Sequence, residues 1–470
     1  MTNTTNPIQD ESFRDRIGTV DASGKRKWIF PKKPKGRYTK ARNYVNFFLL
    51  AFLFSAPFVR IDGEPMLLFN VIERKFVLFG QVFWPQDFYI FLFAALTFIV
   101  FIALFTVVYG RLFCGWVCPQ TIFMEGVFRK IEYAIDGDWK QQMKLKKQAW
   151  NTEKITKRVA KHTIFYAISF LIANTFLAYI IGSDALLDIV TSPPLEHIGG
   201  LIAILIFSGV FYGVFAFFRE QVCTTVCPYG RLQSVLLDRQ SVVVAYDYGR
   251  GETRAKFRKN EDRAATGKGD CIDCGHCVNV CPTGIDIRHG TQLECVNCTA
   301  CIDACDEMMD AVNLPKGLIR YASEEQIAER KPFALSTRAR GYSVVLVLLL
   351  GIMVTLLVTR SDLQVNVLKT PGMVFRKNDD GSISNLYNFK MINKSNHEMN
   401  LQIVPADTAI KVQVIGRAPV MQKQEVAEGS FFLTAPADAF EFGKTETELG
   451  IYNSEGELLE TVEIRITGPL

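Results

Sequence analysis

The chain has 470 residues, a hydrophobic content of 49% and a formal net charge of +5 at pH 7. It is too long for one ordinary domain, and 36 phenylalanines beside 21% charged residues are unusual for a soluble protein. The positive charge lies beside apolar stretches, where membrane topology explains it, so no nucleic acid partner is needed.

Residues 1–43 are polar and basic, without the apolar core of a cleavable signal peptide. They lack periodic apolar spacing, so we expect a basic cytoplasmic tail that is mobile or lies along the surface. Alternatively, the segment could lie against anionic lipid headgroups, with Trp28, Phe30 and Tyr38 in the interface.

Five apolar stretches are long enough to cross a bilayer. They occupy residues 44–59, 88–108, 162–182, 198–218 and 342–358. We predict a membrane domain over residues 44–218, with four helices and a charged, helical cytoplasmic connector at 125–160. A fifth membrane helix is expected over residues 341–360. Five spans would put the two termini on opposite sides of the membrane.

The lysine and arginine counts predict the orientation, because cytoplasmic segments carry the excess. Nine of these residues lie between Lys25 and Arg42, eleven lie in residues 109–161, three separate the first two spans, and residues 183–197 hold none. The N-terminus and all twelve cysteines are therefore expected in the cytoplasm, and the chain beyond Arg360 outside. Thiols in a reducing cytosol stay available as metal ligands.

Eight of the twelve cysteines form two consecutive CxxCxxCxxxC runs in the cytoplasmic segment, residues 219–340. Three close thiolates hold three irons of a four-iron, four-sulfur cluster, and the fourth ligand comes from the other run. A double zinc site would favour CxxC pairs with a longer gap. We therefore predict an α+β two-cluster ferredoxin domain of bacterial type over about residues 262–316. The expected ligand sets are Cys271, Cys274, Cys277 and Cys305 for one cluster and Cys295, Cys298, Cys301 and Cys281 for the other.

The other four cysteines form two CxxxCP motifs, one after the second span and one after the fourth. They are Cys114, Cys118, Cys223 and Cys227. An arginine precedes each motif, Arg111 or Arg219, so the two segments look like an internal repeat. Each arginine could neutralise anionic thiolates or anchor a helix end in headgroups.

If a helix continues through each CxxxCP motif, positions i and i+4 put both sulfurs of a pair on one face. Pro119 and Pro228 would then mark a helix end or restart. Both preceding spans run in the same direction, so the four thiols should emerge at similar depth and could converge. Soft sulfur ligands suit copper(I) or a third iron–sulfur cluster, and a reversible disulfide is equally compatible.

Residues 361–470 change to short alternating stretches separated by Asp, Gly, Asn and Pro turns. Strands at about ten-residue spacing predict an antiparallel β-sandwich of immunoglobulin type. We expect this external domain to dock a partner, although it could instead only cap the last membrane helix.

The chain as a whole resembles the cytochrome c oxidase accessory proteins of the CcoG, FixG or RdxA type. The repeated CxxxCP motifs, the CIDAC sequence followed by Asp306 rather than proline, and the external β domain carry the resemblance. It implies a multi-pass protein of the bacterial inner membrane with a periplasmic C-terminal domain. It also implies reduction of Cu(II) to Cu(I) for assembly of a cbb3-type oxidase, with the CxxxCP cysteines as catalytic and copper-binding residues.

The expected partners are the lipid bilayer, a cytosolic electron donor, and the cbb3-type oxidase or its assembly and copper-delivery factors. A second copy of the chain is a further candidate. Two other functions stay open. One is a quinol-oxidising electron-transfer subunit, like the membrane ferredoxins of nitrate and nitrous oxide respiration, which share both cysteine motifs. The other is a non-enzymatic assembly scaffold or redox sensor.

Overall fold

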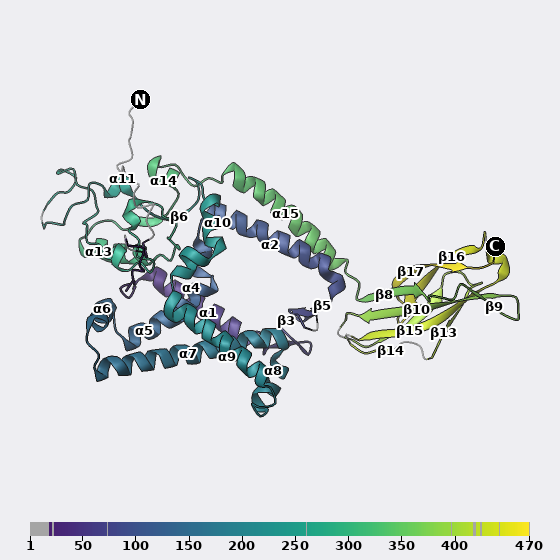
Figure 1. Ribbon diagram of the computed structural model, residues 1–470. Coiled ribbons are helices and arrows are strands. Elements are labelled where there is room, and N and C mark those ends of the chain that lie inside the picture. The colour runs from purple at the N-terminus through teal and green to yellow at the C-terminus, as the bar shows by residue number, and fades with distance from the viewer. Residues whose placement is uncertain are drawn as a thin grey trace. The chain divides into compact units, whose positions relative to one another are not determined.

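The computed structural model describes residues 18–20, 23–72, 74–259, 261–395, 397–416, 420–423, 425–440 and 442–469. The chain divides into two compact units, whose elements are labelled in Figure 1. The first unit comprises Met1–Val59 and Phe93–Leu350, and the second comprises Arg60–Leu92 and Gly351–Leu470. Each unit therefore combines segments that are distant in the sequence.

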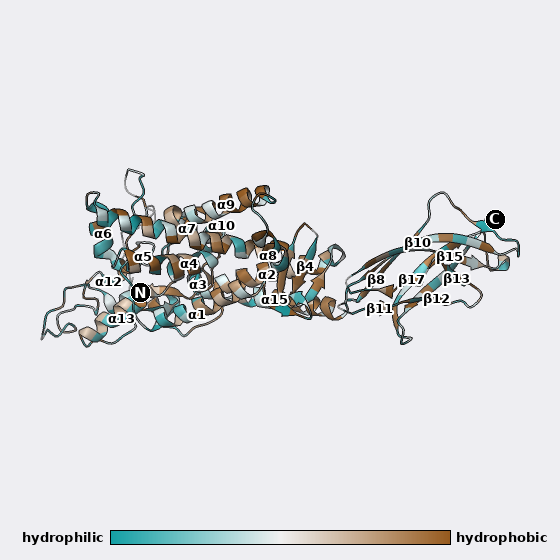
Figure 2. Cartoon of the chain, turned by 90° about the horizontal axis from the view of Figure 1, so that it is seen from below, coloured by the Kyte–Doolittle hydropathy of each residue, from teal (hydrophilic) through white to brown (hydrophobic). Residues whose placement is uncertain are grey.

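Four helices in the described part of the chain are long and apolar enough to cross a membrane. They are α2 (Phe88–Tyr109), α7 (Thr152–Ile181), α9 (Ile198–Gly213) with its π-helical extension to Phe218, and α15 (Thr337–Val358). Figure 2 shows the apolar colouring concentrated on these long helices. At most 33% of any apolar window is buried, as lipid-facing helices require. These helices coincide with four of the five predicted spans.

The first predicted span, residues 44–59, corresponds to helix α1 (Arg37–Ser55). This helix carries three basic residues in its first two turns, so its apolar part is too short to place it among the four. It nevertheless packs with the other helices of the bundle. Leu50 and Phe54 contact the core around α7, and the Tyr179 hydroxyl donates to the Leu53 carbonyl at 2.8 Å. The count of five spans stays a prediction.

The core of the helical bundle is built from aromatic rings. Phe128 is fully buried and stacks on Phe215 with ring centroids 4.5 Å apart, while Phe165 meets its ring edge-on at 4.8 Å. Such contacts add to the free energy gained by burying the rings themselves. Phe128 lies in the predicted connector, so this segment belongs to the bundle core as well as to its surface.

Two short helices, α3 (Leu112–Trp116) and α4 (Pro119–Phe123), precede the connector predicted at 125–160. The connector is helical, as predicted, but it is divided into the π-helix η3 (Met124–Phe128), α5 (Arg129–Ile135), α6 (Trp139–Lys147) and the beginning of α7. A further short helix, α8 (Ser183–Thr191), joins α7 to α9. After α9 follow a π-helical turn, η5 (Val222–Val226), and α10 (Pro228–Leu236).

The cysteine runs are enclosed by a small α+β domain. Strand β6 (Val243–Tyr246) pairs antiparallel with β7 (Ile319–Ala322), and between them lie the short helix α12 (His276–Asn279) and helix α13 (Ala300–Ala311). Buried apolar residues of both strands pack against cysteines of both runs. The two strands therefore close a domain that begins before residue 262 and ends after residue 316.

The described part of the N-terminal segment lies along this domain in defined contacts. The Lys32 N–H donates to the Asn279 carbonyl at 2.7 Å, and the Thr39 N–H donates to the Asp303 carboxylate at 2.7 Å. The Trp28 ring contacts the guanidinium groups of Arg26 and Arg219, 4.6 and 4.7 Å from its centroid. These contacts favour a surface-lying segment over the lipid-interface alternative. Residues 1–17 fall outside the described residues.

The second unit contains a sheet that the sequence did not predict. Between α1 and α2, strands β3 (Leu67–Asn70), β4 (Lys75–Leu78) and β5 (Gln81–Phe83) form an antiparallel meander. A short hairpin precedes this meander, and its strands β1 (Arg60–Ile61) and β2 (Glu64–Pro65) have two residues each.

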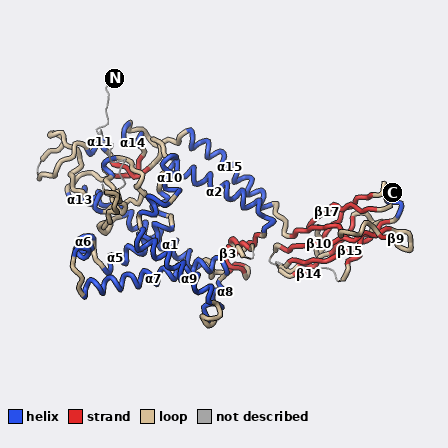
Figure 3. The backbone as a smooth tube through the Cα atoms, in the orientation of Figure 1, coloured by secondary structure: helices blue, strands red, loops and turns tan. Residues whose placement is uncertain are grey.

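The C-terminal residues form the predicted β-sandwich, drawn in red in Figure 3. One sheet has the order β13-β15-β10-β8, with β9 paired to β10, and the other has the order β12-β16-β17. Its strands are β8 (Leu363–Lys369), β9 (Arg376–Lys377), β10 (Ile383–Asn393), β12 (Gln402–Pro405), β13 (Lys411–Val414), β15 (Val426–Ala435), β16 (Lys444–Tyr452) and β17 (Leu458–Thr467). Alternate residues such as Met391, Phe431 and Ile466 fill the core between the sheets.

Candidate metal centre

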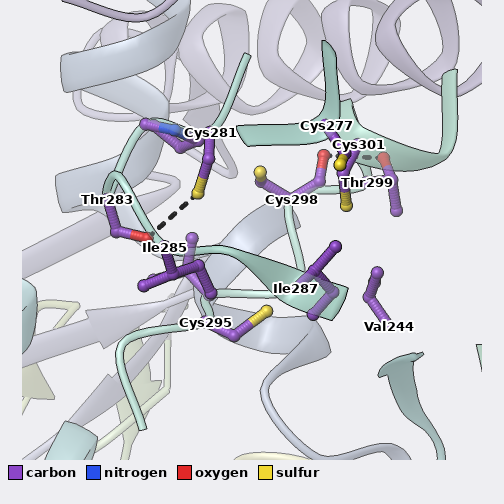
Figure 4. Close-up of a pocket in the computed structure, with 12 residues that line it drawn as sticks. Val244, Cys277, Cys281, Thr283, Ile285, Ile287, Cys295, Cys298, Thr299 and Cys301 are labelled. Carbon is purple, nitrogen blue, oxygen red and sulfur yellow. Dashed lines mark hydrogen bonds between the residues drawn. The ribbon is translucent and has the colours of Figure 1, made fainter. Parts of the chain in front are cut away.

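The cysteines predicted to bind the second cluster line one small cavity (Figure 4). These are Cys281, Cys295, Cys298 and Cys301, and Cys277 also reaches the cavity wall. Burial, with a smaller contribution from neighbouring Cys298 and Cys281, raises the pKa of Cys295 to about 12. The structure thus brings Cys281 from the first run to the three cysteines of the second, as the crossed ligand set requires.

The other predicted set gathers around α12 and α13. Burial, with smaller contributions from nearby Cys277, Cys271 and Cys274, raises the pKa of Cys305 to about 12. Cys271 and Cys277 are buried, whereas Cys274 is exposed to solvent. The proximity of Cys305 to the first run agrees with the crossed ligand sets, which stay a prediction, and the exposed Cys274 puts the first set nearer to solvent.

The donor chemistry of both sets fits four-iron clusters. Among the described residues, no three His, Cys, Asp or Glu side chains lie close enough together to hold one metal ion. A cluster needs no such group, because each of its four thiolates binds a different iron. Asp306, which replaces the usual proline, accepts a hydrogen bond from the Gly317 N–H at 3.0 Å and leaves Cys305 in its place.

The helix breaks inside each CxxxCP motif. Cys118 is the N-cap of α4 and Cys227 the N-cap of α10, so the following proline occupies the first helical position. The N–H of Cys118 donates to the Phe113 carbonyl at 2.9 Å, and the N–H of Cys227 donates to the Val222 carbonyl at 2.8 Å. The helix restart expected at each proline is therefore observed, whereas no helix continues through either motif.

The four CxxxCP thiols lie within electrostatic range of one another. Burial raises the pKa of Cys223 to about 12, and Cys118, Cys114 and Cys227 each add to the rise in this pKa. Cys114 and Cys223 also pack against the buried residues around Cys298 of the second run. The structure thus brings both pairs together and places them beside one of the predicted cluster sites.

A residue that flanks each motif forms hydrogen bonds to the other motif or to the chain beside it. The fully buried Gln233 follows the second motif and donates from Nε2 to Cys114 Sγ at 3.3 Å. Arg111 precedes the first motif and donates to the carbonyls of Gly230 and Leu293. Burial raises the pKa of Cys114 to about 11, and Arg111 partly opposes this rise, so its role in neutralising thiolates stays a prediction. Because Arg111 is buried and donates to these carbonyls, it does not anchor a helix end in headgroups.

The first CxxxCP motif is docked directly on the second cysteine run. A Cβ at Gly115 would lie only 2.5 Å from the Val296 carbonyl oxygen, so only glycine permits this approach. The Trp116 Nε1–H donates to the Tyr321 hydroxyl at 3.1 Å, and this hydroxyl donates to the Asn297 carbonyl at 3.3 Å. Sequence reasoning missed this docking, although the glycine between the two cysteines is a signal for close backbone approach.

Arg219 belongs to a buried network of charges and does not anchor a helix end in headgroups. It donates to both carboxylate oxygens of Glu132 at 3.1 and 2.6 Å, while Arg129 and Lys161 lie 3.8 and 3.7 Å from the same carboxylate. Burial alone would raise the pKa of Glu132, but the three cations outweigh it and lower this pKa. The network fixes the connector to the chain segment that leads into the second motif.

Comparison with known protein families now defines the class of this protein. Residues 218–324 match a family described as "4Fe-4S dicluster domain", residues 91–139 match one described as "4Fe-4S binding domain", and residues 353–469 match the "IG-like fold at C-terminal of FixG". With its apolar helices, the chain is a membrane protein of the iron–sulfur oxidoreductase class.

Two curated relatives cover most of the chain. Protein RdxA of Cereibacter sphaeroides is 35% identical over 413 residues, which cover 83% of this chain and 85% of the relative. The nitrogen fixation protein FixG of Rhizobium meliloti is 33% identical over 437 residues, with 84% and 82% covered. The chain therefore belongs to the FixG/RdxA family. A crystal structure of a FixG-related protein from Vibrio parahaemolyticus matches 24% of this chain and the whole of that chain at 21% identity, with a TM-score of 0.20.

Proposed function

We propose that this protein carries electrons from a cytosolic donor to the CxxxCP thiols, where Cu(II) is reduced to Cu(I) for delivery to a cbb3-type oxidase. The observation that carries the proposal is the packing of Cys114 and Cys223 against the residues around Cys298. When bound, the two clusters would supply single-electron transfer at low potential. Each copper ion needs one electron, and the Cu(I) that forms prefers thiolate ligands.

The burial of the cysteines supports an order of sites from solvent inward. Cys274 is exposed, so a cytosolic donor can approach the first ligand set from that side. Cys298 is buried beside Cys114, so the second set is the natural neighbour of the thiol pairs. Arg111 lies near both Cys114 and Cys295 and compensates their negative charge when they are deprotonated.

We place the protein in the bacterial inner membrane, with the N-terminus and the cysteines in the cytoplasm and the β-sandwich in the periplasm. The lysine and arginine counts support this orientation. The sandwich is then available to dock the oxidase or its copper-delivery factors. We keep a homodimer as a further proposal for the membrane domain.

Serine substitution of one CxxxCP pair tests the proposal. Replacing Cys223 and Cys227 together should abolish copper reduction while the cluster absorbance stays intact. A matched variant, Cys305→Ser, should lose the first cluster and copper reduction but keep copper binding at the thiol pairs. If the Cys223 and Cys227 variant reduces copper at the wild-type rate, these thiols are not the site.

One observation favours a different role for the CxxxCP thiols. The 4Fe-4S binding match over residues 91–139 includes only two cysteines, Cys114 and Cys118. A cluster there would need the second pair to complete its four ligands. In that case the serine variant would lose iron together with activity, and the intact protein would hold about twelve irons rather than about eight.

A further inference from the structure

The β3–β5 sheet of the second unit carries apolar side chains in both of its turns. Val71 and Ile72 in the β3–β4 turn are 67% and 79% exposed, and Phe79 in the β4–β5 turn is 64% exposed. Turns usually hold Gly, Asn, Asp or Ser. Phe79 also adopts a left-handed backbone conformation with φ of 51°, which is costly for a bulky residue. The sheet therefore presents apolar groups where polar ones would be easier to accommodate.

Aromatic contacts fix this sheet to the beginning of a membrane helix. Phe76 and Phe83 lie on one face of the sheet, and their ring centroids are 5.3 and 5.4 Å from that of Phe91 in the first turn of α2. Phe69 stands directly opposite Phe76 in the strand register, so it lies on the same face. The face that meets α2 thus carries a phenylalanine on each of its three strands.

A second set of contacts fixes the sheet to the end of another membrane helix. Arg360 lies two residues beyond α15 and donates to the Val82 carbonyl at 2.5 Å and to Asp87 at 3.0 Å. Its guanidinium group also lies 4.7 Å from the Phe83 ring centroid. Asp87 is fully buried and also forms an ion pair with Lys394 at 2.6 Å.

These two attachments determine the depth of the sheet. The apolar helix α2 begins at Phe88 and the apolar helix α15 ends at Val358, so in a bilayer these two ends would lie near the boundary of the apolar layer. A sheet held by Phe91 on one helix and Arg360 beyond the other must lie at that boundary. The exposed apolar surface of α2, which includes Phe88 and Leu92, continues directly into the sheet.

We propose that the β3–β5 sheet lies in the membrane interface, with Val71, Ile72 and Phe79 inserted at the boundary between phospholipid headgroups and acyl chains. Amphipathic elements bind there through a buried apolar surface, and neighbouring basic groups contact lipid phosphates. Arg74 is exposed beside Ile72 and can serve as such a group. The sheet would thus hold the junction with the β-sandwich against the bilayer, independently of the copper reaction.

A photo-crosslinking amino acid at position 72 or 79 tests this assignment in native membranes. Both side chains are largely exposed, so the substitutions should leave the fold intact. After illumination, mass spectrometry should find phospholipid adducts at both positions. The control is the same amino acid in place of Gln413, an exposed polar residue of the β-sandwich, where lipid adducts should be absent.

Three outcomes would overturn the assignment. Adducts to another protein would make the turns a docking surface, adducts between two copies would make them a dimer contact, and lipid adducts no more abundant than at position 413 would leave the turns in water. Copper reduction should stay at the wild-type rate in all crosslinker variants. Failure of the lipid assignment and failure of the proposed function are therefore separate results.

Discussion

Substitution of Gly115 by alanine should disturb the contact between the first CxxxCP motif and the second cysteine run. The new Cβ would lie 2.5 Å from the Val296 carbonyl oxygen, whereas ordinary contacts begin at 3.4 Å, so the two backbones must separate by 0.9 Å (3.4 − 2.5). The opposing atoms belong to the main chain and cannot rotate away. Overpacking of this kind costs about 1–3 kcal/mol.

The predicted consequence is slower electron delivery with intact clusters. The Gly115→Ala variant should keep the iron content and cluster absorbance of the wild type. Anaerobically reduced protein mixed with Cu(II) in a stopped-flow instrument should reoxidise more slowly, because the CxxxCP thiols lie farther from the second ligand set. A Cu(I) chelator in the same experiment should report slower formation of Cu(I).

Gly209→Ala is the matched control, because a Cβ at Gly209 of α9 would meet nothing within 4 Å. This variant should match the wild type in melting temperature and in reoxidation rate. The reasoning is refuted if Gly115→Ala behaves like the control in both measurements, since the motif would then not touch the second run.

Three further predictions follow from the same contacts. The double variant Cys271→Ser and Cys305→Ser should lose about four irons, because both residues belong to one predicted ligand set. The double variant Cys271→Ser and Cys281→Ser should lose about eight irons, because it affects both sets. If each run instead held its own cluster, the two iron losses would be exchanged. Glu132→Gln removes the carboxylate that Arg219 contacts at 2.6 Å, while Arg129 keeps Glu125 at 3.0 Å and Lys161 keeps Asp136 at 2.5 Å. It should destabilise the fold by about 3 kcal/mol, the lower end of the cost of breaking a buried ion pair, whereas the exposed Glu153→Gln should leave the melting temperature unchanged. Because the pKa of Glu132 is lowered in the fold, its stabilisation is lost only as the pH falls through that lowered pKa. The difference between wild type and Glu132→Gln should therefore stay constant from about pH 8 to pH 6, and narrowing within that range would contradict the assignment.

Local sequence patterns predicted the helices, strands and motifs that are determined by residues close together in the sequence. The apolar lengths predicted four of the long helices, and alternating stretches predicted strands such as Leu363–Lys369 and Leu458–Thr467. The cysteine spacing predicted two crossed ligand sets, and the cavity that Cys281 shares with Cys295, Cys298 and Cys301 agrees with one of them. Each of these signals lies within a short window of the sequence.

The parts that were missed depend on contacts between distant segments. Gln233 is an ordinary helix residue by sequence, and only the fold brings it to Cys114, 119 residues earlier. Glu132 likewise looks like one charge in a charged connector, although it is buried against Arg219. The β3–β5 sheet was overlooked because Val71 and Ile72 occupy a turn that carries no turn signal.

The central claim is that the CxxxCP thiols handle copper beside two four-iron clusters. Metal analysis of anaerobically purified protein, with and without serine at Cys223 and Cys227, tests it most directly. The account predicts about eight irons in both proteins and copper binding only in the wild type. About twelve irons in the wild type, falling to about eight in the variant, would contradict it and identify the four thiols as ligands of a third cluster.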